Sequence, residues 1–181
     1  MFSKKGFTLI ELVVVFTVIA ILSTIGTVSL VAYSRTQALN QVTSDLLQTL
    51  NTAKSLSASQ LKSLNRNGKT LLCLDSQTLG GYGVQINTSD QNNEYYALYI
   101  KCVGGNGVGT PELGDPAWQM PLPKNITFDQ AQSDYTTDVF FPVLSGGIIT
   151  KGSGNADTIA IKSYGQIKKI SIVSGYIDIS Q

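Results

Sequence analysis

Few side chains in this sequence have the types and spacing that support chemistry. The 181 residues include no histidine, which removes the usual general base, His-ligated metal sites and the Ser-His-Asp and Cys-His pairs. Cys73 and Cys102 can form a disulfide or remain buried thiols, and two thiols alone do not complete a zinc site. A single acid, Glu11, stands inside an apolar stretch and requires a partner for its charge. The sequence therefore predicts a protein that is not an enzyme and that has no cofactor or metal.

One polar loop has the alternating oxygen ligands that calcium sites use. Asp90, Asn92 and Glu94 are spaced two residues apart between two expected strands. The alternative is a solvated hairpin tip, which needs no ligand, and this is the interpretation that we favour.

Composition points to a membrane segment. Lys and Arg number 13 against 12 Asp and Glu, a net charge of +1, which argues against bulk electrostatic binding of nucleic acid. Only 14% of residues are charged, 43% are hydrophobic, and mean hydropathy is +0.11. This chain is too apolar to be disordered, and its length suits one domain or one domain with an appendage.

The apolar residues gather near the N-terminus. From Phe7 to Ser34 the only ionisable side chain is Glu11, and as a helix this stretch would be roughly 42 Å long, enough to cross a bilayer. Lys4 and Lys5 precede it and would hold the N-terminus in the cytoplasm, so that the remainder is exported. A cleaved signal peptide or a plain anchor would share this hydropathy, but the apolar stretch is longer than in a cleaved signal.

The residues Lys-Lys-Gly-Phe-Thr-Leu-Ile-Glu-Leu at positions 4–12 resemble the processing motif of type IV prepilins and the related pseudopilins. The resemblance implies that a prepilin peptidase removes the leader, residues 1–6, by cutting between Gly6 and Phe7. It also implies N-methylation of Phe7, while the hydrophobic helix is kept. This fits the retained segment that the hydropathy indicates.

The resemblance also implies a partner for the negative charge of Glu11. Cleavage would create a positive α-amine on Phe7, and two opposite charges brought together in a low dielectric offset much of each other's desolvation. In the family, the carboxylate is thought to meet the amine of a neighbouring subunit during assembly. The alternative is an acid that reaches the lipid headgroups because it lies close to the helix start.

Periodicity predicts one long helix from residue 7 to about residue 64. Residues 7–33 would be the transmembrane part and filament core, and residues 34–64 an amphipathic half whose apolar face includes Val42, Leu46 and Leu50. That face should pack against a β-rich globular head, residues 65–181, rather than form a coiled coil.

Short alternating runs separated by turn residues predict the strands of the head. Cys73 and Cys102 fall in two of these strands, outside the cytoplasm, where disulfides persist, so we favour a bond over two thiols. A proline- and glycine-rich loop, 104–124, should lack regular structure, and the last four strands resemble a meander. The expected strands are 71–74, 82–87, 95–103, 138–144, 147–150, 157–163, 166–173 and 176–180.

A long N-terminal helix packed on an antiparallel sheet is the pilin-like α+β architecture, and the hairpins resemble FimT-like minor pilins and H-type pseudopilins. The resemblance implies a structural subunit of a type IV pilus or a type II secretion-like filament. Its partners would be other subunits, the prepilin peptidase, the membrane and the inner-membrane assembly platform. It would begin as a single-pass inner-membrane protein and end in a surface pilus or periplasmic pseudopilus. The alternative is a membrane-anchored extracytoplasmic binding domain that never polymerises.

Binding of DNA for uptake is a third possibility that the sequence disfavours. Lys162, Lys168 and Lys169 lie on neighbouring expected strands and could contact phosphate. The DNA-binding FimT-like pilins carry Gly-Arg-x-Arg in the last hairpin, whereas residues 175–178 here read Gly-Tyr-Ile-Asp. We therefore interpret the lysines as a solvated strand edge and consider DNA an improbable partner.

Overall fold

The computed structural model divides the chain into two compact units, residues 1–37 and residues 38–181. The second, which we call the globular unit, combines the last part of the helix with the strands. The residues described are 8–66, 69–73, 77–89, 93–104, 119–131, 136–152, 157–173 and 176–180.

The predicted N-terminal helix is confirmed as α1, Leu9–Ser59. Within the globular unit, Val42, Leu46 and Leu50 are buried, as their spacing predicts, and Leu39 joins them with 1% of its surface exposed. Full burial of each leucine contributes about 1.5–3 kcal/mol, so this face fixes the helix to the strands that follow.

The helix ends at Ser59 rather than near residue 64, and the chain after it forms a strand. Gln60 has a left-handed backbone conformation, φ 55°, which stops the helix. The next two carbonyls are used elsewhere: Leu61 O accepts from Tyr82 Oη at 2.7 Å, and Lys62 O accepts from the Cys73 amide at 3.0 Å. Long-range partners thus replace the bonds that would have prolonged the helix.

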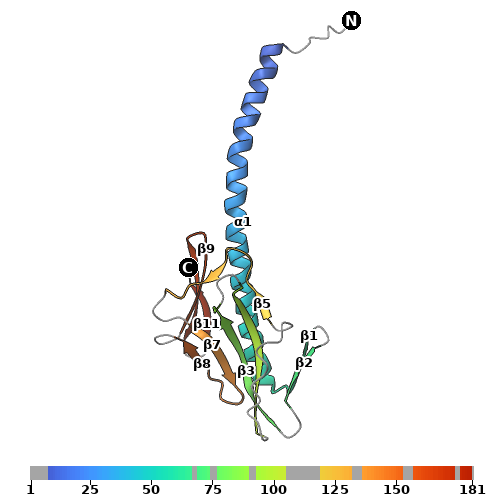
Figure 1. Ribbon diagram of the computed structural model, residues 1–181, viewed down its shortest axis with the longest axis vertical. Helices are drawn as coiled ribbons and strands as arrows, with labels where there is room; N and C mark the ends of the chain where they lie inside the picture. The colour runs from blue at the N-terminus through green and yellow to red at the C-terminus, as the bar shows by residue number, and fades with distance from the viewer. Residues whose placement is uncertain are drawn as a thin grey trace. The chain divides into compact units, whose positions relative to one another are not determined.

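The described strands form three antiparallel sheets (Figure 1). A hairpin pairs β1 (Ser63–Arg66) with β2 (Lys69–Leu72). The five-stranded sheet has the order β5-β4-β3-β7-β8, from β3 (Thr78–Asn87), β4 (Tyr95–Val103), β5 (Gln119–Pro121), β7 (Thr136–Pro142) and β8 (Ile149–Gly152). The four-stranded sheet has the order β11-β10-β9-β6, from β6 (Thr127–Phe128), β9 (Thr158–Ser163), β10 (Gln166–Val173) and β11 (Tyr176–Ser180).

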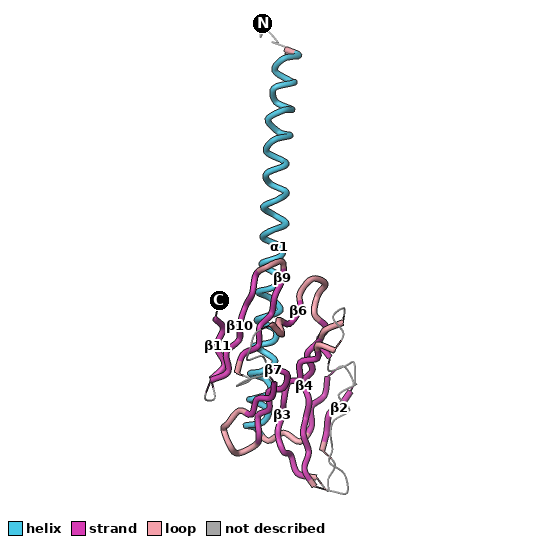
Figure 2. Tube along the Cα trace, turned by 60° about the vertical axis from the view of Figure 1, so that its left-hand side comes forward, coloured by secondary structure: helices cyan, strands magenta, loops and turns pink. Residues whose placement is uncertain are grey.

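The C-terminal meander is confirmed for three of its four strands. Figure 2 shows β9, β10 and β11 side by side, and they pair in sequence order. The expected fourth member, β8, instead pairs with β7 at the edge of the five-stranded sheet. Part of the expected irregular loop is also a strand, β5, which ends at Pro121; proline is tolerated there because β5 is an edge strand.

One apolar cluster joins the helix to both larger sheets. Leu46 and Leu50 of α1 lie in the same buried cluster as Tyr82 of β3 and Ile161 of β9. Ser57, 2% exposed, adds a hydrogen bond from its hydroxyl to the Phe141 carbonyl at 2.6 Å. The amphipathic half of α1 is therefore part of this core.

A disulfide joins Cys73 to Cys102, the pairing that the sequence favours. Cys73 directly follows β2, and Cys102 lies in β4. Both residues are buried. The bond therefore ties the β1-β2 hairpin to the five-stranded sheet.

Glycine is required at position 83 by the packing on the outer face of the five-stranded sheet. A Cβ on Gly83 would lie 2.4 Å from Cζ of Tyr99, whose ring crosses the glycine. From there the Tyr99 hydroxyl donates to Asp138 Oδ1 at 2.8 Å. Burial raises the pKa of Asp138, and the hydrogen bond from Tyr99 and the charges of Lys151 and Lys101 lower it in part.

We expect replacement of both cysteines, Cys73→Ser with Cys102→Ser, to lower the free energy of unfolding by about 3 kcal/mol, because the unfolded chain loses a cross-link that spans 29 residues. Urea unfolding of the full chain in detergent measures this, with the wild type under reducing conditions as control. An unchanged midpoint would contradict a stabilising role for the bond.

We expect Gly83→Ala to destabilise the globular unit by about 1–3 kcal/mol, because the new methyl must displace the Tyr99 ring. The matched control is Gly147→Ala, where the nearest atom lies 3.6 Å away. A thermal melt compares the two variants. In a Tyr99→Leu background the cost of Gly83→Ala should shrink, and equal costs in both backgrounds would refute the ring contact as its cause.

Candidate functional site

In the described part of the first unit, residues 8–37, α1 begins at Leu9 and its apolar side chains are exposed. Phe16, Leu22 and Leu30 expose 62%, 63% and 71% of their surfaces. The other large apolar side chains described in this segment are also exposed. By length and composition this helix is able to cross a membrane, and none of its most apolar window is buried within the chain. Such a surface requires lipid or other apolar helices around it.

Glu11 takes part in the start of this helix. Thr8 donates from its amide to Glu11 Oε2 at 2.9 Å and from its hydroxyl to the same oxygen at 2.8 Å. The Glu11 amide lies 3.4 Å from the Thr8 hydroxyl oxygen and donates to it. This reciprocal pair is a capping box, which satisfies amides that the first helical turn leaves without partners.

Thr8 is a functional candidate that the sequence analysis missed. The signal was present, since Thr-Leu-Ile-Glu at 8–11 has the Thr-x-x-Glu spacing of a capping box directly before an apolar run. Glu11 therefore has a local role in addition to its expected intersubunit role. Gly6 and Phe7, the expected cleavage and methylation positions, lie outside the described residues.

The three lysines considered for phosphate binding do not share one surface. Lys168 is opposite the buried Ile161 in the β9-β10 register, so it lies on the core side of that sheet. Lys169 and Lys162 lie on the other face, because side chains alternate along strands. Lys162 is also paired, with its Nζ 3.1 Å from Asp129 Oδ1. The arrangement offers a polyanion no common stripe of positive charge.

The interpretation of Asp90, Asn92 and Glu94 as a solvated hairpin tip is wrong for Glu94. Glu94 is buried, with 6% of its surface exposed, and its carboxylate accepts a hydrogen bond from the Phe128 amide. Asp90 and Asn92 lie outside the described residues. Among the residues described, no group of three or more His, Cys, Asp or Glu side chains gathers as a metal site would.

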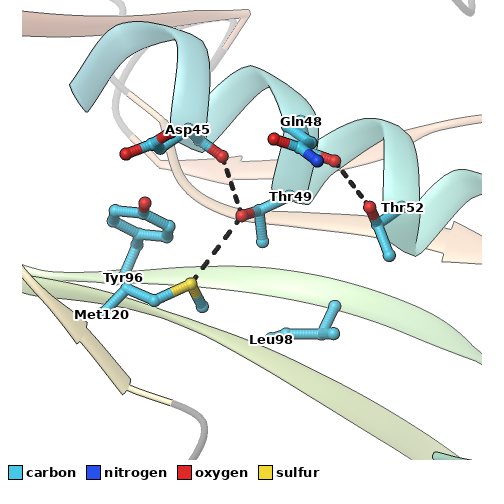
Figure 3. A pocket seen from close by; sticks show the side chains of 7 residues that line it. All are labelled: Asp45, Gln48, Thr49, Thr52, Tyr96, Leu98 and Met120. Atoms are coloured by element: carbon cyan, nitrogen blue, oxygen red, sulfur yellow. Dashed lines mark hydrogen bonds between the residues drawn. The ribbon is translucent and has the colours of Figure 1, made fainter. Parts of the chain in front are cut away.

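A groove of about 320 Å³ lies between α1 and the edge of the five-stranded sheet. In Figure 3, Thr49 from the helix faces Met120 from β5, and its Oγ1 lies 3.7 Å from the Met120 sulfur. The hydroxyls of Thr49 and Thr52 donate to carbonyls of their own helix at 2.8 Å. Both threonine hydroxyls of the groove are therefore already engaged by the backbone of their own helix.

Comparison with protein families matches residues 1–27 to the prokaryotic N-terminal methylation motif, which is the leader of type IV prepilins. Comparisons with curated proteins and with solved structures give no match. The motif marks structural pilin-type proteins, not enzymes. One long helix followed by antiparallel sheets is likewise a pilin-like α+β layout. The chain thus carries a prepilin leader on a pilin-like fold, and its apolar helix fits a single-pass membrane anchor.

We expect Thr8→Ala to increase amide hydrogen exchange over residues 9–12, because loss of a helix cap costs about 0.5–2 kcal/mol. Exchange would be followed in the full chain in detergent micelles. Thr17→Ala is the control, since the Thr17 hydroxyl donates to Val14 O inside the helix. Equal exchange in the two variants would show that the capping box does not hold the helix start.

Proposed function

We propose that this chain is a non-enzymatic subunit, a minor pilin or pseudopilin, of a type IV pilus or type II secretion-like filament. The observation that carries the proposal is the combination of a prepilin leader with an apolar helix that exposes its side chains on all sides. In a filament, neighbouring helices would replace the lipid around this surface. Dispersion contacts between helices drive such an exchange, since lipid tails are as apolar as the side chains.

Maturation would proceed at the positions that the motif indicates. A prepilin peptidase would cut between Gly6 and Phe7 and leave a methylated α-amine on Phe7. The subunit would wait in the inner membrane with its globular unit outside the cytoplasm. The assembly platform would then move it into a surface pilus or a periplasmic pseudopilus.

Glu11 would pair with the amine of an adjacent subunit. In the isolated chain both donors of Thr8 go to Glu11 Oε2, and Oε1 accepts no hydrogen bond from the described residues. Oε1 is therefore the atom available to an incoming Phe7 amine, while the capping box keeps the carboxylate in place. An amine buried without this partner would be unfavourable by several kcal/mol, which would select the correct register of the helices.

We expect Glu11→Gln to permit cleavage and membrane insertion but to lower filament yield by about tenfold or more, since a difference of 1.4 kcal/mol already gives this factor. Glutamine keeps an acceptor for the Thr8 amide and removes only the charge, so the variant separates pairing from capping. Ser23→Ala is the control, because its hydroxyl donates to Ile19 O within the helix. Sheared filaments are quantified by immunoblot; normal yield from Glu11→Gln would refute the proposed role of the charge.

Mass spectrometry of the membrane-extracted chain tests the proposal as a whole. A mature N-terminus at methylated Phe7 supports a filament subunit. Retention of residues 1–6 would instead support a membrane-anchored binding domain that does not assemble.

A further inference from the structure

A polar cavity of about 490 Å³ lies in the globular unit where the two larger sheets meet, within the size range of small-molecule sites. Residues 88, 89 and 94, from the two ends of the β3-β4 connection, line one side, and residues of β6, of the turn after it and of β9 line the other. The lining is mainly hydroxyl, amide and charged groups. It consists of Thr88, Ser89, Glu94, Thr127, Phe128, Gln130, Ala131 and Lys162.

Glu94 is the most buried charged group in this lining. Its carbonyl accepts from the Leu122 amide at 2.9 Å, and its carboxylate Oε2 accepts from the Phe128 amide. The second carboxylate oxygen, Oε1, accepts no hydrogen bond from the described residues. A buried carboxylate is costly unless both its charge and its hydrogen-bonding capacity are met. The bond from the Phe128 amide satisfies Oε2, and the described residues supply no donor for Oε1.

The charges around the cavity do not balance. Lys162 is held by Asp129, whose surface is 5% exposed, at 3.1 Å, and these two charges offset each other. Among the described side chains around the cavity, Glu94, Asp129 and Lys162 carry two negative charges and one positive charge when ionised. Burial raises the pKa of Glu94, and the Phe128 amide and the charge of Lys162 lower it only in part. The described charges around the cavity thus sum to one negative charge, which a cation bound beside Glu94 would balance.

We propose that this cavity binds a hydroxylated primary amine, with the ammonium on Glu94 Oε1 and the hydroxyl groups on Lys162, Gln130 and the neighbouring Thr and Ser hydroxyls. A single ammonium supplies the missing charge, and its hydroxyls match the donors and acceptors of the rest of the lining. A divalent cation fits less well, because a second acid, Asp129, is already bound to Lys162. The inference is independent of filament assembly, since every residue involved lies in the globular unit.

The test uses the full chain in detergent micelles and three probes: glucosamine, glucose and ethylamine. Binding is measured by calorimetry and by shifts of the Phe128 amide in NMR spectra. We expect glucosamine to bind at least about tenfold more tightly than glucose, which lacks the amine, and than ethylamine, which lacks the hydroxyls. Equal affinities for glucosamine and glucose, or no binding of any probe, would overturn the proposal.

Glu94→Gln tests the carboxylate, because the amide keeps an acceptor for Phe128 and loses the charge. It should weaken glucosamine binding about tenfold or more and leave glucose unchanged. Asp178→Asn, an exposed acid on β11 that bonds the Ile179 amide, is the matched control and should bind as the wild type does. If Glu94→Gln fails to fold, Gln130→Ala, an exposed position in the lining, should still weaken glucosamine several-fold. Unchanged affinity in the folded lining variants would refute the site.

The pH dependence gives a separate readout. The amine must meet an ionised Glu94, so glucosamine affinity should fall as pH is lowered through the raised pKa of this carboxyl. Lys162 and Asp129 face the same region but form their own pair. In Glu94→Gln the fall should disappear, and persistence of the same pH profile in that variant would contradict the assignment.

Discussion

The described residues bury none of the most apolar part of the N-terminal helix, and this exposed apolar surface limits where the protein can reside. In the first unit, side chains such as Phe16 and Leu30 are exposed over most of their area. Water would oppose this exposure, so lipid or other helices must surround the segment. Because lipid and helix are equally apolar, exchange between them costs little burial energy, which makes the same segment suitable as an anchor and as an assembly surface.

The charge of Glu11 has to be stabilised both in the lipid bilayer and between packed helices. The capping box explains how Glu11 is tolerated before any neighbour arrives, since Thr8 supplies two donors to one carboxylate oxygen. These bonds use one carboxylate oxygen and leave the other for the proposed partner. Local helix capping and the proposed pairing between subunits are therefore compatible uses of one carboxylate, and in the proposed pairing Thr8 would be a positioning residue.

In the globular unit, polar groups are matched across elements far apart in sequence. Tyr99 crosses Gly83 to reach Asp138, and Glu94 joins the β3-β4 connection to the start of the four-stranded sheet. Neither contact could be predicted, because Glu94 in sequence resembles an exposed loop acid. The lysines show the same limit of sequence analysis. The sequence correctly predicts that Lys162 and Lys168 lie on neighbouring strands, but only the pairing register places Lys168 on the core side of the sheet.

The sequence by itself determined the features that depend on local order: the prepilin leader, the long apolar helix, the buried stripe at Val42, Leu46 and Leu50, and most strands. Periodicity and a contiguous motif carry this information because neighbouring residues act together. The tertiary structure alone decided the end of α1 at Ser59, the transfer of β8 to the other sheet and the burial of Glu94. For β8 the choice lay between its two neighbours in the chain, and it pairs with β7 before it rather than with β9 after it. The end of the helix and the burial of Glu94 depend on hydrogen bonds between residues distant in sequence, and no local pattern encodes such partners.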